Sequence, residues 1–210
     1  MQKKEALLSI KGLCISFTGQ KVLNDFTLDV RRHEKLVLKG KSGIGKSSLV
    51  KALLGFTGKI EGEIIYEGKK IDEHNINDLR AAVAWMPQGL DLSDEPVIDF
   101  LKMPFSFRQN AEHKFDEVHL RELMHQFELE DKLLKKKLNQ LSGGERQRFI
   151  LILCLMMKRP LMLLDEPTAS LDSDIRDKVV QHLFELRDTG ILFITHDPVI
   201  TKRADRVVKI

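Results

Sequence analysis

The stretch Gly40-Lys41-Ser42-Gly43-Ile44-Gly45-Lys46-Ser47-Ser48 decides the fold of this chain. It fits the phosphate-binding pattern G-x-x-x-x-G-K-[ST]. Residues 35–39 before it alternate like a half-buried strand, and residues 48–54 after it have the apolar spacing of a helix. Glycines let successive backbone N–H groups turn inward, and the start of a helix adds positive potential. We therefore predict a phosphate site in which Lys46 reaches the β- and γ-phosphates and Ser47 binds Mg²⁺.

The composition is that of an ordinary globular protein. The chain has 210 residues, 42% hydrophobic and 31% charged, which suits one sizeable domain. Its net charge of +3 comes from 34 basic and 31 acidic residues, a balance that gives no argument for nucleic-acid binding on charge alone. The first residues lack the apolar core of a secretory signal, and the longest apolar run, 149–157, is too short to cross a bilayer. These features predict a soluble cytosolic protein. The charge balance does not exclude nucleic-acid binding, but we expect no nucleic-acid partner.

The two cysteines carry no sign of a metal site. Cys14 and Cys154 lie far apart in sequence, and neither has a partner at metal-ligand spacing. We expect two buried thiols in a reducing compartment.

Strand and helix patterns alternate along much of the chain. Residues 7–39 are rich in strand patterns, and 62–66 followed by Glu67-Gly68 reads as a strand and a tight turn. A short apolar strand at 81–86 ends before Pro87, because proline cannot donate to a ladder. Gln88 then lies immediately past a strand, where its side chain can point into a site.

A helical insertion interrupts this alternation at residues 89–140. Pro96 suits the first turn of a helix that Pro104 stops, and residues 120–127 have amphipathic spacing. Beyond the insertion, a helix runs to Met157 and a helix capped by Ser173 or Asp174 follows later. The buried strands 161–164 and 191–195, together with 207–210, complete a parallel sheet whose ligand lies at the carboxyl ends of the strands.

Two carboxylates follow the strand at 161–164. Asp165 stands where the Walker B arrangement holds Mg²⁺, and Glu166 is the candidate general base for an attacking water. Taken alone, the pair could merely end a strand. The phosphate-binding stretch elsewhere in the chain favours the catalytic interpretation.

Taken together, these motifs resemble those of the ATP-binding cassette (ABC) ATPase family. The resemblance covers nearly the whole chain, and the most discriminating motif is Leu141-Ser142-Gly143-Gly144-Glu145. The other matching segments, in the family's order, are 40–48, Gln88, 161–166, Ser170-Leu171-Asp172 and His196. The family's alanine-rich stretch is replaced here by residues 149–155, which indicates heavier packing beneath the signature helix.

The resemblance implies an α/β fold with a P-loop NTPase core. In this fold a mostly parallel central sheet is joined by an N-terminal antiparallel β subdomain and an inserted α-helical subdomain. The whole chain, 1–210, would be a single ABC ATPase domain. Residues 1–88 and 141–210 would form the nucleotide-binding core, and 89–140 the helical signature subdomain.

The resemblance also implies roles for individual residues. Ser142, Gly143 and Gly144 would cap the γ-phosphate of an ATP bound to a second copy or a paired subunit. Gln88 would touch Mg²⁺ and the attacking water, and His196 would contact the γ-phosphate and position the water with Glu166. Asp172 would reach across the dimer. For Phe17 the sequence alone favours neither core packing nor contact with a ligand; the resemblance implies that its ring stacks on the adenine, where the family more often has tyrosine.

The implied function is that of the ATP-hydrolysing subunit of a bacterial ABC transporter. Such a subunit is cytoplasmic, dimerises around two ATP molecules and docks on a membrane-spanning permease at the inner face of the cell membrane. One alternative is a soluble ABC ATPase, for example in iron–sulfur assembly, which membrane association would distinguish. A second is a P-loop kinase, which phosphate release without an added acceptor would distinguish.

Overall fold

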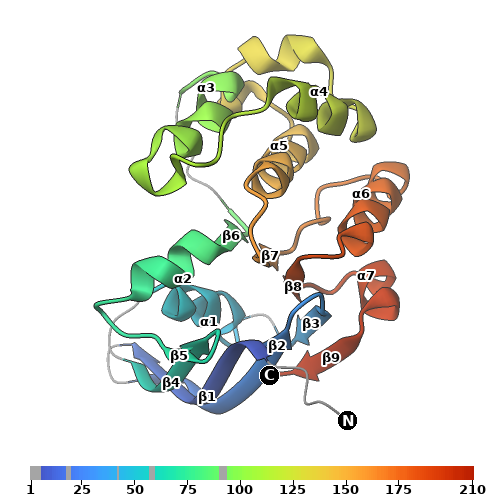
Figure 1. The fold of residues 1–210 in the computed structure, drawn as a ribbon. Helices are drawn as coiled ribbons and strands as arrows, with labels where there is room; N and C mark the ends of the chain where they lie inside the picture. Colours follow the sequence, from blue (N-terminus) through green and yellow to red (C-terminus); the bar gives the residue numbers. More distant parts are fainter. Residues whose placement is uncertain (1–5, 18–19, 42, 57–59, 90–93) are drawn as a thin grey trace.

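Two β-sheets and the helices around them make up the described part of the chain (Figure 1). The computed structural model describes residues 6–17, 20–41, 43–56, 60–89 and 94–210, without the side chains of Phe17, Gln20 and Lys21. Within these ranges, no helix is long and apolar enough to cross a membrane.

The larger sheet has five strands in the order β6-β7-β8-β3-β9, and all neighbours run parallel. This confirms the predicted parallel sheet. Its strands are β3 (Lys35–Lys39), β6 (Val83–Met86), β7 (Leu161–Asp165), β8 (Gly190–Ile194) and β9 (Arg206–Lys209).

Strand β7 shows why this sheet must be covered on both faces. Leu161 and Leu163 belong to one apolar cluster, whereas Met162 and Leu164 belong to another. Successive side chains of a strand point to opposite faces, so a continuous apolar run needs a cover on each side. One cluster includes α1 (Lys46–Leu53) and the second sheet, and the other includes α5 (Gly143–Met156) and α6 (Ser173–Glu185).

The second sheet is antiparallel, with the order β2-β1-β4-β5. Opposite apolar residues such as Leu8 with Val30 and Ile10 with Leu28 direct its inner face to the core. The expected antiparallel β region is therefore confirmed. Its strands are β1 (Ala6–Phe17), β2 (Gln20–Arg31), β4 (Ile60–Tyr66) and β5 (Lys69–Lys70).

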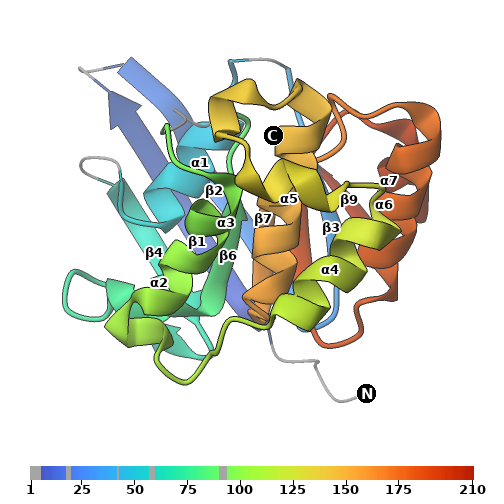
Figure 2. The ribbon, with the colours of Figure 1, turned by 90° about the horizontal axis from the view of Figure 1, so that it is seen from above.

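The predicted insertion is helical in its described part. It holds α3 (Val97–Lys102), α4 (Glu117–Gln126) and four 3₁₀ segments, and Figures 1 and 2 show it beside α5. One apolar cluster runs from α3 and α4 through α5 into β6 and β7, so the domain boundaries at 88 and 141 remain a prediction. The 3₁₀ segments are Met103–Ser106, Arg108–Asn110, Asp131–Lys135 and Leu138–Gln140.

An aromatic contact joins the segment just after α1 to β6. The Phe56 and Trp85 rings stack with centroids 5.7 Å apart, and the Arg80 guanidinium lies over Phe56 at 5.0 Å from its centroid. Phe56 is nevertheless 57% exposed. The contact links the helix that begins at the phosphate loop to the strand that leads to Gln88.

Several element boundaries differ from the prediction. Residues 81 and 82 belong to the helix α2 (Ile76–Ala82), because alanine favours helix and only Val83–Met86 pairs with β7. Pro96 is the N-cap of α3 and precedes its first turn, while Pro104 lies in a 3₁₀ segment that continues from α3. The remaining helix is α7 (Pro198–Arg203).

The cap of α6 and the burial of one cysteine were also predicted wrongly. Asp172, rather than Ser173 or Asp174, caps α6 by accepting a hydrogen bond from the Ile175 N–H. Cys154 is buried as expected, and burial raises the pKa of its thiol to about 12. Cys14 is only half-buried, because it lies at an irregular stretch of β1 where its sulfur accepts a hydrogen bond from Asp25.

Candidate functional site

Four strands of the parallel sheet end around one cavity of about 380 Å³. The phosphate-binding stretch follows β3, Gln88 follows β6, Glu166 follows β7 and His196 follows β8. Parallel strands bring their carboxyl ends to the same edge, so residues far apart in sequence meet there. The lining residues are Gly43, Gly45, Lys46, Ser47, Ser48, Gln88, Asp165, Glu166, Ala169 and His196.

The backbone of the phosphate-binding stretch depends on its glycines. Gly43 and Gly45 have φ values of 81° and 106°, in the left-handed region that side chains disfavour. A Cβ atom at Gly45 would also lie 2.7 Å from Val22 Cγ1. The helix α1 begins at the next residue without a side-chain cap, so its first N–H groups are available to an anion.

Lys46 lies folded against this loop. Its ammonium donates hydrogen bonds to the carbonyl oxygens of Gly40 and Lys41, at 2.7 and 2.9 Å. These carbonyls hold the positive charge beside the glycines, where a phosphate group would bring its negative charge. Of the other residues in this loop, Ser48 also lines the cavity. Ile44 is not one of the lining residues, and its side chain is 36% exposed. Ser42 lies outside the described residues.

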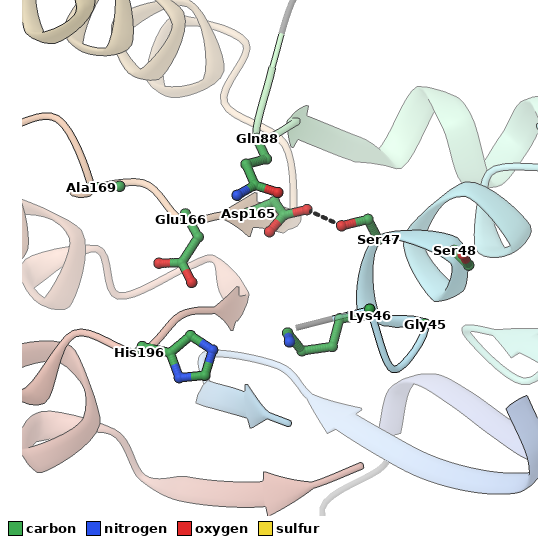
Figure 3. Close-up of a pocket in the computed structure, with 10 residues that line it drawn as sticks. Gly45, Lys46, Ser47, Ser48, Gln88, Asp165, Glu166, Ala169 and His196 are labelled. Carbon is green, nitrogen blue, oxygen red and sulfur yellow. Dashed lines mark hydrogen bonds between the residues drawn. The ribbon is translucent and has the colours of Figure 1, made fainter. Parts of the chain in front are cut away.

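Ser47 and Asp165 meet on the cavity wall, as Figure 3 shows. The Ser47 hydroxyl donates to Asp165 Oδ2 at 2.7 Å. Asp165 is only 5% exposed, and its pKa is raised mainly by burial and further by the charge of Glu166, against the opposing effects of Ser47 and Lys46. A buried carboxylate beside a hydroxyl and the Gln88 amide is an oxygen-donor set that fits Mg²⁺.

This set does not form a closed metal site by itself. Among the described residues, no group of three or more His, Cys, Asp or Glu side chains could hold a metal ion. Mg²⁺ is commonly held by one or two carboxylates, substrate phosphates and water, and Asp165 with Ser47 suits that arrangement.

Glu166 is held by the last residue of β8, Ile194, and by Thr195, which follows it. Its φ is 49°, its N–H donates to the Ile194 carbonyl at 2.8 Å, and its Oε2 accepts from the Thr195 hydroxyl at 2.9 Å. Figure 3 shows Glu166 and His196 on one side of the cavity and Lys46 with Ser47 on the other. Thr195 is fully buried, and we did not predict its contact with Glu166.

The signature residues do not line this cavity. Ser142, an exposed N-cap of α5, accepts from the Glu145 N–H at 3.2 Å, and its own N–H donates to Glu145 Oε2 at 2.8 Å. This capping box supports the predicted helix start. The Asp172 carboxylate is likewise exposed and caps α6 of its own chain. The Phe17 side chain lies outside the description.

Comparisons with known proteins assign the family. The sequence model of the ABC transporter family matches residues 23–169. The "Probable iron export ATP-binding protein FetA" of Escherichia coli (strain K12) is 28% identical over 99% of this chain and 92% of its own length. The "Fe(3+) ions import ATP-binding protein FbpC" of Streptomyces avermitilis is 33% identical over 96% of this chain, which spans 59% of that relative.

A solved structure shows the same fold. "Dimeric Structure of MJ0796, a Bacterial ABC Transporter Cassette" superposes with a TM-score of 0.82 at 23% identity, covering 97% of this chain and 94% of the other. The cavity, the sequence match and the fold agree with one another. Because the family match covers more than half of the chain, this protein belongs to the ABC transporter family and is one of its ATPase cassettes.

Proposed function

We propose that this chain is the ATP-hydrolysing subunit of a bacterial transporter and drives a membrane-spanning permease. It acts from the cytoplasmic face of the cell membrane, as a homodimer or paired with a second ABC subunit, with ATP and Mg²⁺ at each shared site. The two relatives described above support this proposal, since both are named as ATP-binding proteins for export or import. No nucleic acid takes part.

One observation carries the two-chain arrangement. The cavity contains the phosphate loop and the carboxylates, whereas the exposed N-terminus of α5 with Ser142 and Gly143 lies outside it. A helix N-terminus offers N–H donors to an anion. We propose that Ser142, Gly143 and Gly144 contribute these donors to the γ-phosphate of ATP bound to the other chain. We also propose that Asp172, which is exposed and follows the Ser170 and Leu171 that lie beside Gly144, contacts that chain.

Binding of ATP uses the wall of the cavity that carries Lys46 and Ser47. The N–H groups of the loop surround the β- and γ-phosphates, and Lys46 exchanges its two carbonyl contacts for phosphate oxygens. Phe17 stacks on the adenine through its ring face. Ser47, Asp165 and Gln88, which line this cavity, would hold Mg²⁺. When bound, Mg²⁺ supplies positive charge that offsets the charge of the phosphate oxygens.

Hydrolysis uses the opposite wall of the cavity, which carries Glu166 and His196. Glu166 accepts a proton from water as the water oxygen bonds to the γ-phosphorus, and the bond from phosphorus to the β–γ bridging oxygen breaks. The products are ADP and inorganic phosphate, and Glu166 then releases its proton. Thr195 holds the Glu166 carboxylate, and His196 and Gln88 orient the water and the γ-phosphate. Lys46 stabilises the charge that develops on the leaving oxygen.

The assignment of the base predicts the behaviour of Glu166→Gln. This variant keeps the size of the side chain but cannot accept the proton, so we expect normal ATP binding, loss of turnover and an ATP-dependent dimer. Phosphate release and size-exclusion chromatography with ATP measure the two effects. The matched control is Glu185→Gln on the exposed face of α6, which should behave as wild type. A Glu166→Gln variant that hydrolyses ATP at the wild-type rate contradicts this assignment.

The transport role needs a different measurement. We expect the chain to co-purify from detergent-solubilised membranes with a protein of several membrane spans, and to leave the membrane fraction when that partner is deleted. A chain found only in the soluble fraction, with full ATPase activity, would favour a soluble ABC ATPase such as one in iron–sulfur assembly.

A further inference from the structure

Gln147, in the second turn of α5, joins the signature helix to the catalytic segment of its own chain. Its Nε2 donates to the backbone carbonyl of Glu166 at 2.6 Å, and its Oε1 accepts from the Ser170 N–H at 2.9 Å. One half-buried side chain therefore spans both ends of the segment that leaves β7.

A second contact shows how closely the helix is seated on this segment. A Cβ atom at Gly144 would lie 2.8 Å from the Ser170 carbonyl oxygen. The missing side chain at Gly144 thus allows α5 to approach Ser170, and Gln147, almost one turn further along the helix, reaches Glu166. The helix start and the catalytic segment consequently have little freedom to move independently.

The backbone at Glu166 needs such support. Its left-handed φ of 49° is unfavourable for a side chain with a Cβ atom, and the following residue is Pro167, which restricts it further. Strained conformations persist where several contacts over-determine them. Here the N–H donates to Ile194, the carboxylate accepts from Thr195, and the carbonyl accepts from Gln147.

We infer that Gln147 is a positioning residue for ATP hydrolysis, because it holds the Glu166 peptide in the orientation that directs the carboxylate into the cavity. The inference rests on the proposed role of Glu166 as the base. It also gives α5 a second function. The helix whose N-terminus is proposed to meet the ATP of the other chain is thus also held, through Gln147, against the segment that carries the base of its own chain.

The test is Gln147→Leu, which removes both hydrogen bonds and keeps a side chain of similar bulk. We expect kcat to fall about 10- to 100-fold, the effect of a small misplacement of a catalytic group. The KM for ATP should stay within about twofold, because the residues that bind phosphate are unchanged. With ATP, the variant should accumulate as a dimer, since slow hydrolysis delays reopening.

Two further variants separate positioning from stability. Gln147→Glu keeps the acceptor for Ser170 and loses the donor to Glu166, so it should lose kcat as Gln147→Leu does, and it replaces that variant if the leucine does not fold. Gln181→Leu, on the exposed face of α6, removes a comparable hydrogen bond to Glu185 and should keep wild-type kcat.

An unchanged kcat in both Gln147 variants overturns the inference, as does a loss of kcat that comes with a parallel rise in KM and a lower melting temperature. The failure of the proposed function looks different. In that case wild type releases no phosphate, or Glu166→Gln remains active, whatever the behaviour of Gln147.

Discussion

At Gly45 the backbone and its surroundings both exclude a side chain. The φ of 106° is strained for any residue with a Cβ atom, and that atom would meet Val22. We expect Gly45→Ala to lower the affinity for ATP by about tenfold or more, because left-handed strain of about 1–3 kcal/mol would distort the N–H groups of the loop. Titration with a fluorescent ATP analogue measures this affinity.

Gly68→Ala is the matched control for this prediction. Gly68 has a φ of 76° but faces open space in a turn remote from the cavity. Its replacement should lower the melting temperature and leave ATP affinity unchanged. Equal affinity for Gly45→Ala and wild type would show that the loop tolerates the added methyl group.

Residues of the site were predictable where their motif is local. Lys46 and Ser47 are the first two residues of α1 and Asp165 is the last residue of β7, elements that the pattern of apolar residues reveals, and the structure brings the three together. Thr195 and Gln147 were missed, because their contacts with Glu166 join segments 29 and 19 residues apart and leave no local pattern. The one signal available in the sequence was for Thr195, because it ends the predicted strand 191–195 and stands next to His196.

Among the elements, β3 begins with an unusual lysine. Lys35 is 4% exposed, and its ammonium donates to the carbonyls of Leu186 and Thr189, both at 2.7 Å. Burial lowers the pKa of this lysine to about 8, although Asp205 opposes the shift. The neutral amine still has two N–H groups, so both carbonyls keep their donor when the proton is lost.

This lysine predicts a pH dependence of stability. Between pH 8 and the ordinary pKa of 10.5 the unfolded chain binds more protons than the folded chain, so folding becomes more favourable as pH rises. We expect the melting temperature of wild type relative to Lys35→Met to increase from about pH 7 to about pH 9.5. Titrations shared by the two proteins cancel in this difference. A constant difference across that range would show that Lys35 keeps an ordinary pKa.

Element prediction succeeded for long or strongly apolar segments and failed for short ones. The strand at 161–164 and the helix that ends near Met157 are present because their burial pattern extends over the whole element. The helix α2 has only seven residues and one buried position, Leu79, so its apolar period is too short to recognise. The 3₁₀ segments are likewise three to five residues long.

At the scale of the whole molecule, Arg159 connects the helical insertion to the start of β7 in the parallel sheet. It lies just before β7, donates to the Asn110 side chain and lies 3.2 Å from His113 Nε2. Asn110 is buried and in turn donates to the Pro104 carbonyl at 2.7 Å. These contacts join the 3₁₀ segments of the insertion to a part of the chain far away in sequence.

We expect Arg159→Met to loosen this part of the insertion. The variant leaves a buried amide oxygen without its donor, a cost of about 1–3 kcal/mol. Hydrogen exchange should become faster at residues 103–116 and remain slow in β7 and β8. The control is Arg187→Met, which removes the same charge at an exposed position. Equal exchange in both variants would mean that the insertion is held by its apolar contacts alone.

The stack of Trp85 on Phe56 has a practical consequence for spectroscopy. Trp85 is the only tryptophan of the chain; it lies on the strand that ends before Gln88, and its ring stacks on Phe56, three residues past the helix that starts at the phosphate loop. Its emission should therefore change when ATP is added, and the change in Gly45→Ala should need about tenfold more ATP or greater. The protein carries an intrinsic optical reporter, which can follow nucleotide exchange in real time without a label.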